Sequence, residues 1–83
     1  GTPEGVHIQE VTVAMENDKG VAGVHHVHIW QLDEHRNALE AHVVLSESTG
    51  MDDLKARLKQ MLHEKFEIEH STLEFENKDC NKK

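Results

Sequence analysis

The sequence is poor in cysteine and in aromatic residues. Its 83 residues include one Cys, Cys80, together with one Trp, two Phe and no Tyr. A single cysteine forms no disulfide within the chain, which fits a reducing compartment. So few aromatic side chains do not make a platform on which nucleic-acid bases stack. No stretch approaches the ~20 apolar residues of a transmembrane helix, and no signal-peptide pattern is present. We therefore expect a soluble protein.

Positive charge is scarce as well. The chain has 9 Lys and Arg against 16 Asp and Glu, which gives a formal net charge of −7 with histidine neutral. Binding to nucleic acid depends on Lys and Arg at the phosphates, so we expect no nucleic-acid partner, whereas an acidic surface favours cations. The length predicts one domain, residues 1–83, with a thin core that a partner chain or a metal would stabilise. Because the chain starts without Met, we interpret it as part of a longer protein.

Hydrophobic periodicity predicts five elements. A first helix is expected to start at Thr2-Pro3-Glu4 and to end at residues 17–20, with Gly20 as a left-handed cap. A second helix is expected after a cap at Ser48 or Thr49, with an apolar stripe of Met51, Leu54, Leu58, Met61, Leu62 and Phe66. Strands are expected at residues 24–32, 39–45 and 71–76, with a polar turn at residues 33–37 between the first two.

This order predicts an α+β fold, α-β-β-α-β, in which two helices cover one face of a three-stranded sheet. Residues 77–83 look like a flexible polar tail. Nothing in the chain is left to cover the other sheet face around His28, Trp30 and Val44. An uncovered, partly apolar face predicts a homodimer.

The chain is rich in histidine, with eight in all and three of them in the strand GVHHVHIW, residues 23–30. Regular alternation places His26, His28 and Trp30 on one face of that strand, and His25, Val27 and Ile29 on the other. A single strand histidine is more often an interface residue than a ligand. Imidazoles and carboxylates on three neighbouring strands, however, suit zinc and similar divalent ions. The members on the second and third strands are His42, Glu74 and Glu76.

The register of the first two strands leaves one question open. A hairpin centred on His35 and Arg36 pairs His42 near Ile29 rather than near His25. His25 then reaches His42 either from the segment that leads into the strand or after a bulge has shifted the pairing.

Other polar residues are more easily explained without a ligand. Cys80 is a lone thiol in the tail, His63 belongs to the solvated face of the second helix, and Asp52 and Asp53 favour the positive end of that helix. The sequence has no nucleophile elbow, no glycine-rich phosphate loop and no convincing Cys/His pair. We therefore expect a protein that is not an enzyme.

Four segments carry a resemblance to a known family. They are GTPEGV, GVAGVHHVHIWQL, LEAHVVLS and IEHSTLEFE, which together cover nearly the whole chain. Their pattern resembles the cytoplasmic C-terminal domain of the cation diffusion facilitator family, the zinc, cobalt and cadmium exporters of the CzcD type. The resemblance implies a metallochaperone-like, ferredoxin-like fold that forms a homodimer on the cytoplasmic face of a membrane. It also implies a partner in the transmembrane domain of the same proton-coupled transporter, and Zn²⁺, Cd²⁺ or Co²⁺ as the ion that favours a closed dimer.

The same resemblance implies a set of metal ligands. His25, His42 and Glu76 match family ligands, and Asp52 falls where some members place a bridging histidine. Glu74 also falls where some members have a histidine, and the lone Cys80 departs from a CxxC ending found in some animal members. The secondary candidates are His7, His26, His28, His35, His70 and Glu74, and His26 replaces a common Asp of the family strand.

Two other classes of small α+β domain remain as alternatives. A ferredoxin-like regulatory domain that binds a small-molecule effector at its dimer interface would be stabilised by that effector without metal. A soluble copper chaperone needs a CxxC pair, which this chain lacks.

Overall fold

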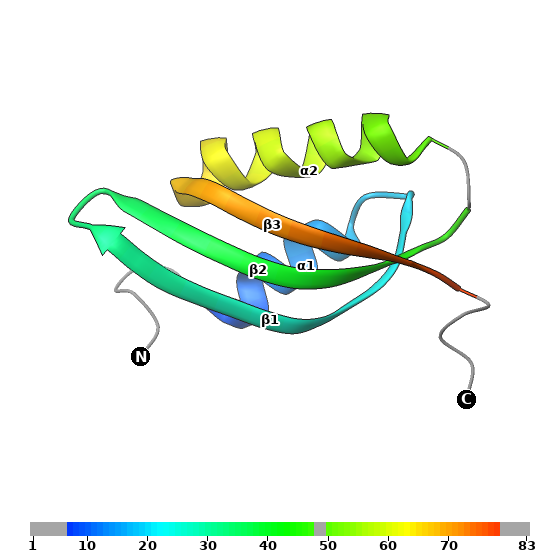
Figure 1. Cartoon of the computed structure of the whole chain (residues 1–83), viewed down its shortest axis with the longest axis horizontal. Coiled ribbons are helices and arrows are strands. Elements are labelled where there is room, and N and C mark those ends of the chain that lie inside the picture. Colours follow the sequence, from blue (N-terminus) through cyan, green and yellow to red (C-terminus); the bar gives the residue numbers. More distant parts are fainter. Residues whose placement is uncertain (1–6, 48–49, 79–83) are drawn as a thin grey trace.

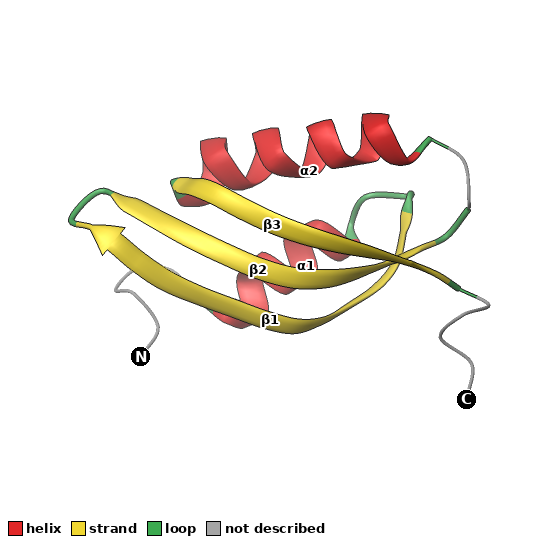
Figure 2. Cartoon of the chain, in the orientation of Figure 1, coloured by secondary structure: helices red, strands yellow, loops and turns green. Residues whose placement is uncertain are grey.

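The computed structural model describes residues 7–47 and 50–78, and its elements follow the predicted order (Figures 1 and 2). They are α1 (Ile8–Glu16), β1 (Val21–Asp33), β2 (Arg36–Leu45), α2 (Met51–Phe66) and β3 (Ile68–Asn77). Two helices and a three-stranded sheet confirm the predicted fold class. Of these helices, none is long and apolar enough to cross a membrane.

The central strand of the sheet is β2, since the strand order is β1-β2-β3. The β1 and β2 strands form an antiparallel hairpin, whereas β2 and β3 run parallel and are connected through α2. A mixed sheet results, in which the carboxyl ends of β2 and β3 lie side by side (Figure 1).

Both helices pack on one face of the sheet. Alternate β2 residues face them and are almost completely buried, among them Leu39, Ala41 and Val43. The helices contribute Val11 and Met15 from α1 and Leu54, Leu58 and Leu62 from α2 to the same core. The intervening β2 residues, including Glu40 and His42, therefore point to the opposite face, which neither α1 nor α2 covers.

The strands are longer than predicted. β1 begins at Val21, so that Gly23 lies inside the strand, and the turn shrinks to Glu34-His35. The predicted left-handed cap at Gly20 is wrong, because Gly50 is the glycine with a positive φ among the described residues. Gly20 instead makes room for α2, since a Cβ there would lie 3.1 Å from the Cδ1 atom of Leu54.

Helix ends are where the sequence pattern was least informative. Several predicted features lie outside the described residues: the helix start at residues 2–4, the caps Ser48 and Thr49, and Cys80 in the tail. Asn77, predicted to open the tail, still belongs to β3. α1 begins at Ile8, and α2 has Gly50 as its N-cap with φ 77°. The predicted stripe of α2 is wrong at Met51, which is 42% exposed because it lies in the first turn at the margin of the core.

Candidate metal centre

A β-bulge in β1 decides where its histidines point. His25 pairs with His42 and His28 pairs with Glu40, so three steps along β1 match two along β2. His26 lies in this irregularity with φ 55°, a left-handed conformation that is uncommon for residues other than glycine and costs roughly 1–3 kcal/mol. The predicted alternation is therefore wrong, since His25 shares the open face with His28. Of the two routes left open for bringing His25 to His42, the bulge is the one observed.

The parallel pairing of β2 with β3 adds carboxylates to this face. His42 lies beside Glu74, and Val44 beside Glu76. One oxygen of Glu76 accepts a hydrogen bond from His25 Nε2 at 3.0 Å and the other accepts one from His42 Nδ1 at 2.6 Å. The second ring nitrogen of His42 lies 3.3 Å from a Glu74 oxygen. A single carboxylate thus joins two imidazoles, and a second one holds the far side of His42.

Three imidazole rings meet at this point. The ring centroids of His25 and His42 are 5.1 Å apart, and those of His26 lie 4.8 Å from His25 and 5.1 Å from His42. Consecutive strand residues normally point to opposite faces, and the bulge is what brings His25 and His26 together. Sequence reasoning missed this convergence, although the HH pair between two hydrophobic strands was its visible signal.

The hydrogen bonds shift the pKa values of two members. The pKa of Glu76 lies below its usual range, because His42 and then His25 donate hydrogen bonds to the carboxylate. The pKa of His42 is raised, chiefly by its hydrogen bond to Glu76. Partial desolvation opposes this shift, and the charges of Glu74 and Glu40 add to it.

These two shifts act in opposite directions on stability. The raised pKa of His42 stabilises the fold below about pH 6.5, and this contribution is lost as the pH rises through the raised value. The lowered pKa of Glu76 stabilises the fold above about pH 4.3, and this contribution is lost as the pH falls through the lowered value. The metal-free pair therefore stabilises the fold most between these limits, and a metal must displace the proton of His42.

The donor set fits a divalent metal ion. His25, His42 and Glu76 each offer one ligand atom, and these atoms lie within 4.8 Å of one another. All three side chains are partly buried, which limits the competition from water. Two imidazole nitrogens and a carboxylate oxygen are ligands that Zn²⁺ and related ions accept. The group is therefore a candidate metal centre on the open face of the sheet.

The remaining predicted site residues lie elsewhere. Asp52 is exposed in the first turn of α2, in the helical layer, and its predicted bridging role stays a prediction. His28 and His70 lie on β1 and β3, beside Glu40 and Ala38 of β2. His35 is in the hairpin turn, 3.8 Å from Glu34. The last candidate, His7, is the exposed N-cap of α1.

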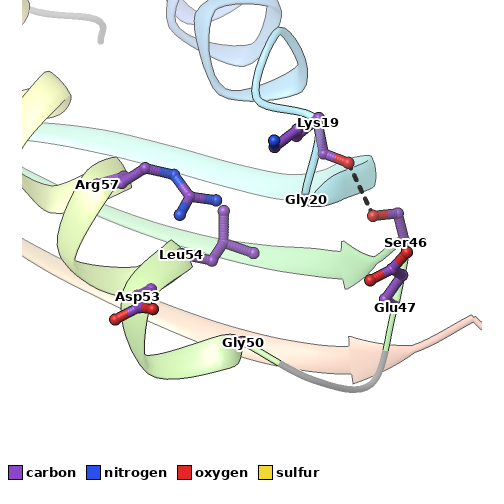
Figure 3. A pocket seen from close by; sticks show the side chains of 8 residues that line it. All are labelled: Lys19, Gly20, Ser46, Glu47, Gly50, Asp53, Leu54 and Arg57. Carbon is purple, nitrogen blue, oxygen red and sulfur yellow. Dashed lines mark hydrogen bonds between the residues drawn. The ribbon is translucent and has the colours of Figure 1, made fainter.

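A hollow of about 390 Å³ lies where β2 leads into α2, and Figure 3 shows its lining. The hollow is bordered by Lys19 and Arg57, with Glu47 and Asp53 as acidic counterparts. The Ser46 hydroxyl donates a hydrogen bond to the Lys19 carbonyl across it (Figure 3). None of the described residues that line it is a histidine, and so its chemistry differs from that of the candidate metal centre.

The fold and the site together define a small acidic α+β domain with a His/Glu centre suited to a divalent cation. Residues 3–78 match the family model described as cation efflux protein, cytoplasmic domain. The chain belongs to this family, which confirms the resemblance drawn from the sequence.

Curated relatives agree with this assignment. The metal cation efflux system protein CzcD of Cupriavidus metallidurans is 36% identical over 96% of this chain and 26% of its own length. A cadmium, cobalt and zinc/H⁺-K⁺ antiporter of Bacillus subtilis is 28% identical over 98% of this chain and 27% of its own length. The chain thus spans about a quarter of these relatives.

Solved structures agree as well. The metal-bound C-terminal domain of the CzcD transporter is 36% identical, covers 86% of this chain and 99% of its own, and superposes with a TM-score of 0.76. A variant of the MamM C-terminal domain is 15% identical, covers 84% of this chain and 89% of its own, and has a TM-score of 0.71. The second likeness shows the fold alone.

Proposed function

We propose that this chain is the metal-sensing and dimerisation domain of a proton-coupled divalent-cation efflux transporter, and that it has no catalytic role. His25, His42 and Glu76 bind the ion. The observation that carries this proposal is the position of Glu76, whose two oxygens lie within 3.0 Å of a nitrogen of each histidine. The attached transmembrane domain of the same transporter is the partner that responds.

The ion is proposed to be Zn²⁺, with Cd²⁺ and Co²⁺ as alternatives. Nitrogen and oxygen donors suit Zn²⁺, and the described group has no thiolate that would favour a softer ion. The Bacillus relative is named for cadmium, cobalt and zinc. This agreement of donor chemistry with a relative's name supports the choice.

Each residue has a separate part in binding. The metal replaces the proton that His42 shares with Glu76, so binding releases a proton wherever that imidazole is charged. The Glu74 carboxylate, 3.3 Å from the other nitrogen of His42, fixes the orientation of the ring. The three metal ligands come from three different strands, so the metal ties the sheet together along its open face.

Dimerisation is proposed to use this same open face. Trp30 and Leu32 on β1 are 45% and 41% exposed, which is unusual for side chains of their size. Two copies at −7 repel each other, and a divalent cation on each reduces that repulsion. The metal thereby favours a closed dimer by binding it better than the open form.

A calorimetric titration of the metal-free chain with Zn²⁺ tests the proposal. The comparison is with the double variant His25→Ala/His42→Ala and with a matched control, His28→Ala/His70→Ala. We expect the first variant to lose the tightest binding event and the control to keep it. Equal binding by the wild type and the His25→Ala/His42→Ala variant would place the site elsewhere.

A further inference from the structure

The ring of His26 lies beside the candidate metal centre, 4.8 Å from His25 and 5.1 Å from His42 between ring centroids. We infer that His26 is a fourth ligand, so that one protomer supplies three nitrogens and one oxygen to a single ion without help from its partner. This inference rests on the proposed function and concerns a position where the family strand commonly has another residue. It is carried by two observations, the spacing of the three rings and the backbone conformation of His26.

The spacing of the rings is that of a tetrahedral site. A tetrahedral Zn²⁺ holds each imidazole nitrogen at about 2.0–2.1 Å, and the ring centre lies about 1.1 Å further out, so two bound rings have centres about 5.2 Å apart. The three observed separations are 4.8, 5.1 and 5.1 Å. His25, His26 and His42 therefore form a nearly equilateral triangle whose size is compatible with three rings bound to one tetrahedral ion.

The fourth position of that tetrahedron belongs to Glu76. Its oxygens lie 3.0 Å from His25 Nε2 and 2.6 Å from His42 Nδ1. On a tetrahedral ion, nitrogen and oxygen ligands are about 3.3 Å apart, so a small widening of the group admits the metal. His26 is exposed, and its nitrogens are not among the ligand atoms that lie within 4.8 Å of one another in the metal-free chain, so metal binding by His26 requires a turn about its side-chain torsions.

The backbone conformation explains how two adjacent residues reach one ion. His26 has φ 55°, and this left-handed residue is the one that breaks the alternation of β1. Glycine would adopt this conformation more readily than histidine. His26 keeps this strained conformation, and its ring faces two other imidazoles. Together these facts point to a role for that ring.

A complete set of four ligands changes how the metal acts. Three ligands leave a position open for water or for a residue of the partner, whereas four close the site. The ion is then bound within each protomer, at one ion per chain, and no ligand is taken from the partner. The metal acts on the dimer through charge and through the shape of the open face.

The test uses two variants that suit the left-handed backbone, His26→Asn and His26→Gly. Neither asparagine nor glycine replaces an imidazole as a Zn²⁺ ligand. We therefore expect each variant to lower the Zn²⁺ affinity by at least about tenfold. Tenfold is the lower end of the affinity loss that follows when an outer partner of a metal ligand is removed. His28→Asn, the same substitution two residues away on β1, is the control and keeps the wild-type affinity. His26→Gly should also raise the melting temperature of the metal-free chain, because glycine accepts a positive φ. Weaker binding by a more stable variant separates lost ligation from damage to the fold.

The coordination itself is read with Co²⁺ in place of Zn²⁺. Four-coordinate tetrahedral Co²⁺ absorbs strongly in the visible range, and six-coordinate Co²⁺ absorbs weakly. We expect an intense spectrum for the wild type and a weak one for His26→Asn, in which water enters the sphere. One result would overturn the assignment of His26 as fourth ligand and leave the proposed function intact. In that result, Zn²⁺ binding by the wild type depends on His25, and the His26→Asn variant binds Zn²⁺ as tightly as the wild type. If the wild type binds no Zn²⁺, both fail.

Discussion

The charge of the protomer predicts a salt-dependent effect of metal on dimerisation. Each protomer carries −7 at neutral pH, and one bound divalent cation makes it −5. With a radius of gyration of 12.5 Å, two protomers in contact have centres ~25 Å apart. Treated as point charges in water, they repel by ~8 kcal/mol without metal and by ~4 kcal/mol with it, before salt is considered.

Screening decides how much of this difference remains. The Debye length is about 30 Å at 10 mM salt and about 8 Å at 150 mM, so the ~4 kcal/mol falls to ~1.7 kcal/mol at the lower salt and to ~0.2 kcal/mol at the higher. Zn²⁺ should therefore tighten the dimer by about 20-fold at 10 mM salt and by less than about 1.5-fold at 150 mM.

Sedimentation equilibrium at pH 8, at both salt concentrations, measures this effect. His25→Ala/His42→Ala is the control and should show no response to Zn²⁺ at either salt. A Zn²⁺ effect of equal size at 10 and 150 mM would refute the reasoning from charge, and would mean that the ion acts through a ligand bridge between protomers.

Further predictions concern the metal centre and the core. Because the pKa of His42 is raised, Zn²⁺ affinity measured by calorimetry should begin to fall above about pH 6.5, the usual value for an imidazole, and an affinity that stays flat from pH 8 to pH 6 would exclude this imidazole as a ligand. Glu74→Gln should weaken Zn²⁺ binding by ~10- to 100-fold in the same assay, and no change would remove its orienting role. Leu62→Ala, at a side chain with no exposed surface, should lower the free energy of unfolding in urea by ~2–5 kcal/mol, and a loss below ~1 kcal/mol would contradict its central place in the core. Gly50→Ala should lower the free energy of unfolding in urea by ~1–2 kcal/mol, because the φ of Gly50 is 77°. Gly23→Ala has equal space around it and no positive φ, and so it should show no such loss.

The fold was predictable because its hydrophobic periods are distinct. Leu39, Ala41 and Val43 alternate with polar residues along β2, and Leu54, Leu58 and Leu62 recur at helical spacing in α2. Each pattern is local, so the sequence alone reveals it. The cap at Gly20 failed because glycine serves turns and close packing equally well, and only the position of Leu54 shows which applies.

The candidate metal centre was predictable by residue type and not by geometry. Donor chemistry and the family resemblance pointed to His25, His42 and Glu76, whose atoms the structure brings together. The convergence of His26 depends on a bulge, and a bulge is a property of strand pairing rather than of one strand. The alternating pattern placed His26 with His28 and Trp30 but put His25 on the opposite face, which is why the meeting of all three imidazoles was not foreseen.

The most direct test of a metal centre on the open face is to observe the imidazole nitrogens themselves. In ¹⁵N-labelled protein, proton–nitrogen correlation spectra of the histidine rings are recorded before and after one equivalent of Zn²⁺. We predict that Nε2 of His25 and Nδ1 of His42, the nitrogens that face Glu76, take metal-bound shifts, while His35 and His63 keep theirs. Metal-bound shifts at His35 or His63, with His25 and His42 unchanged, would contradict the account.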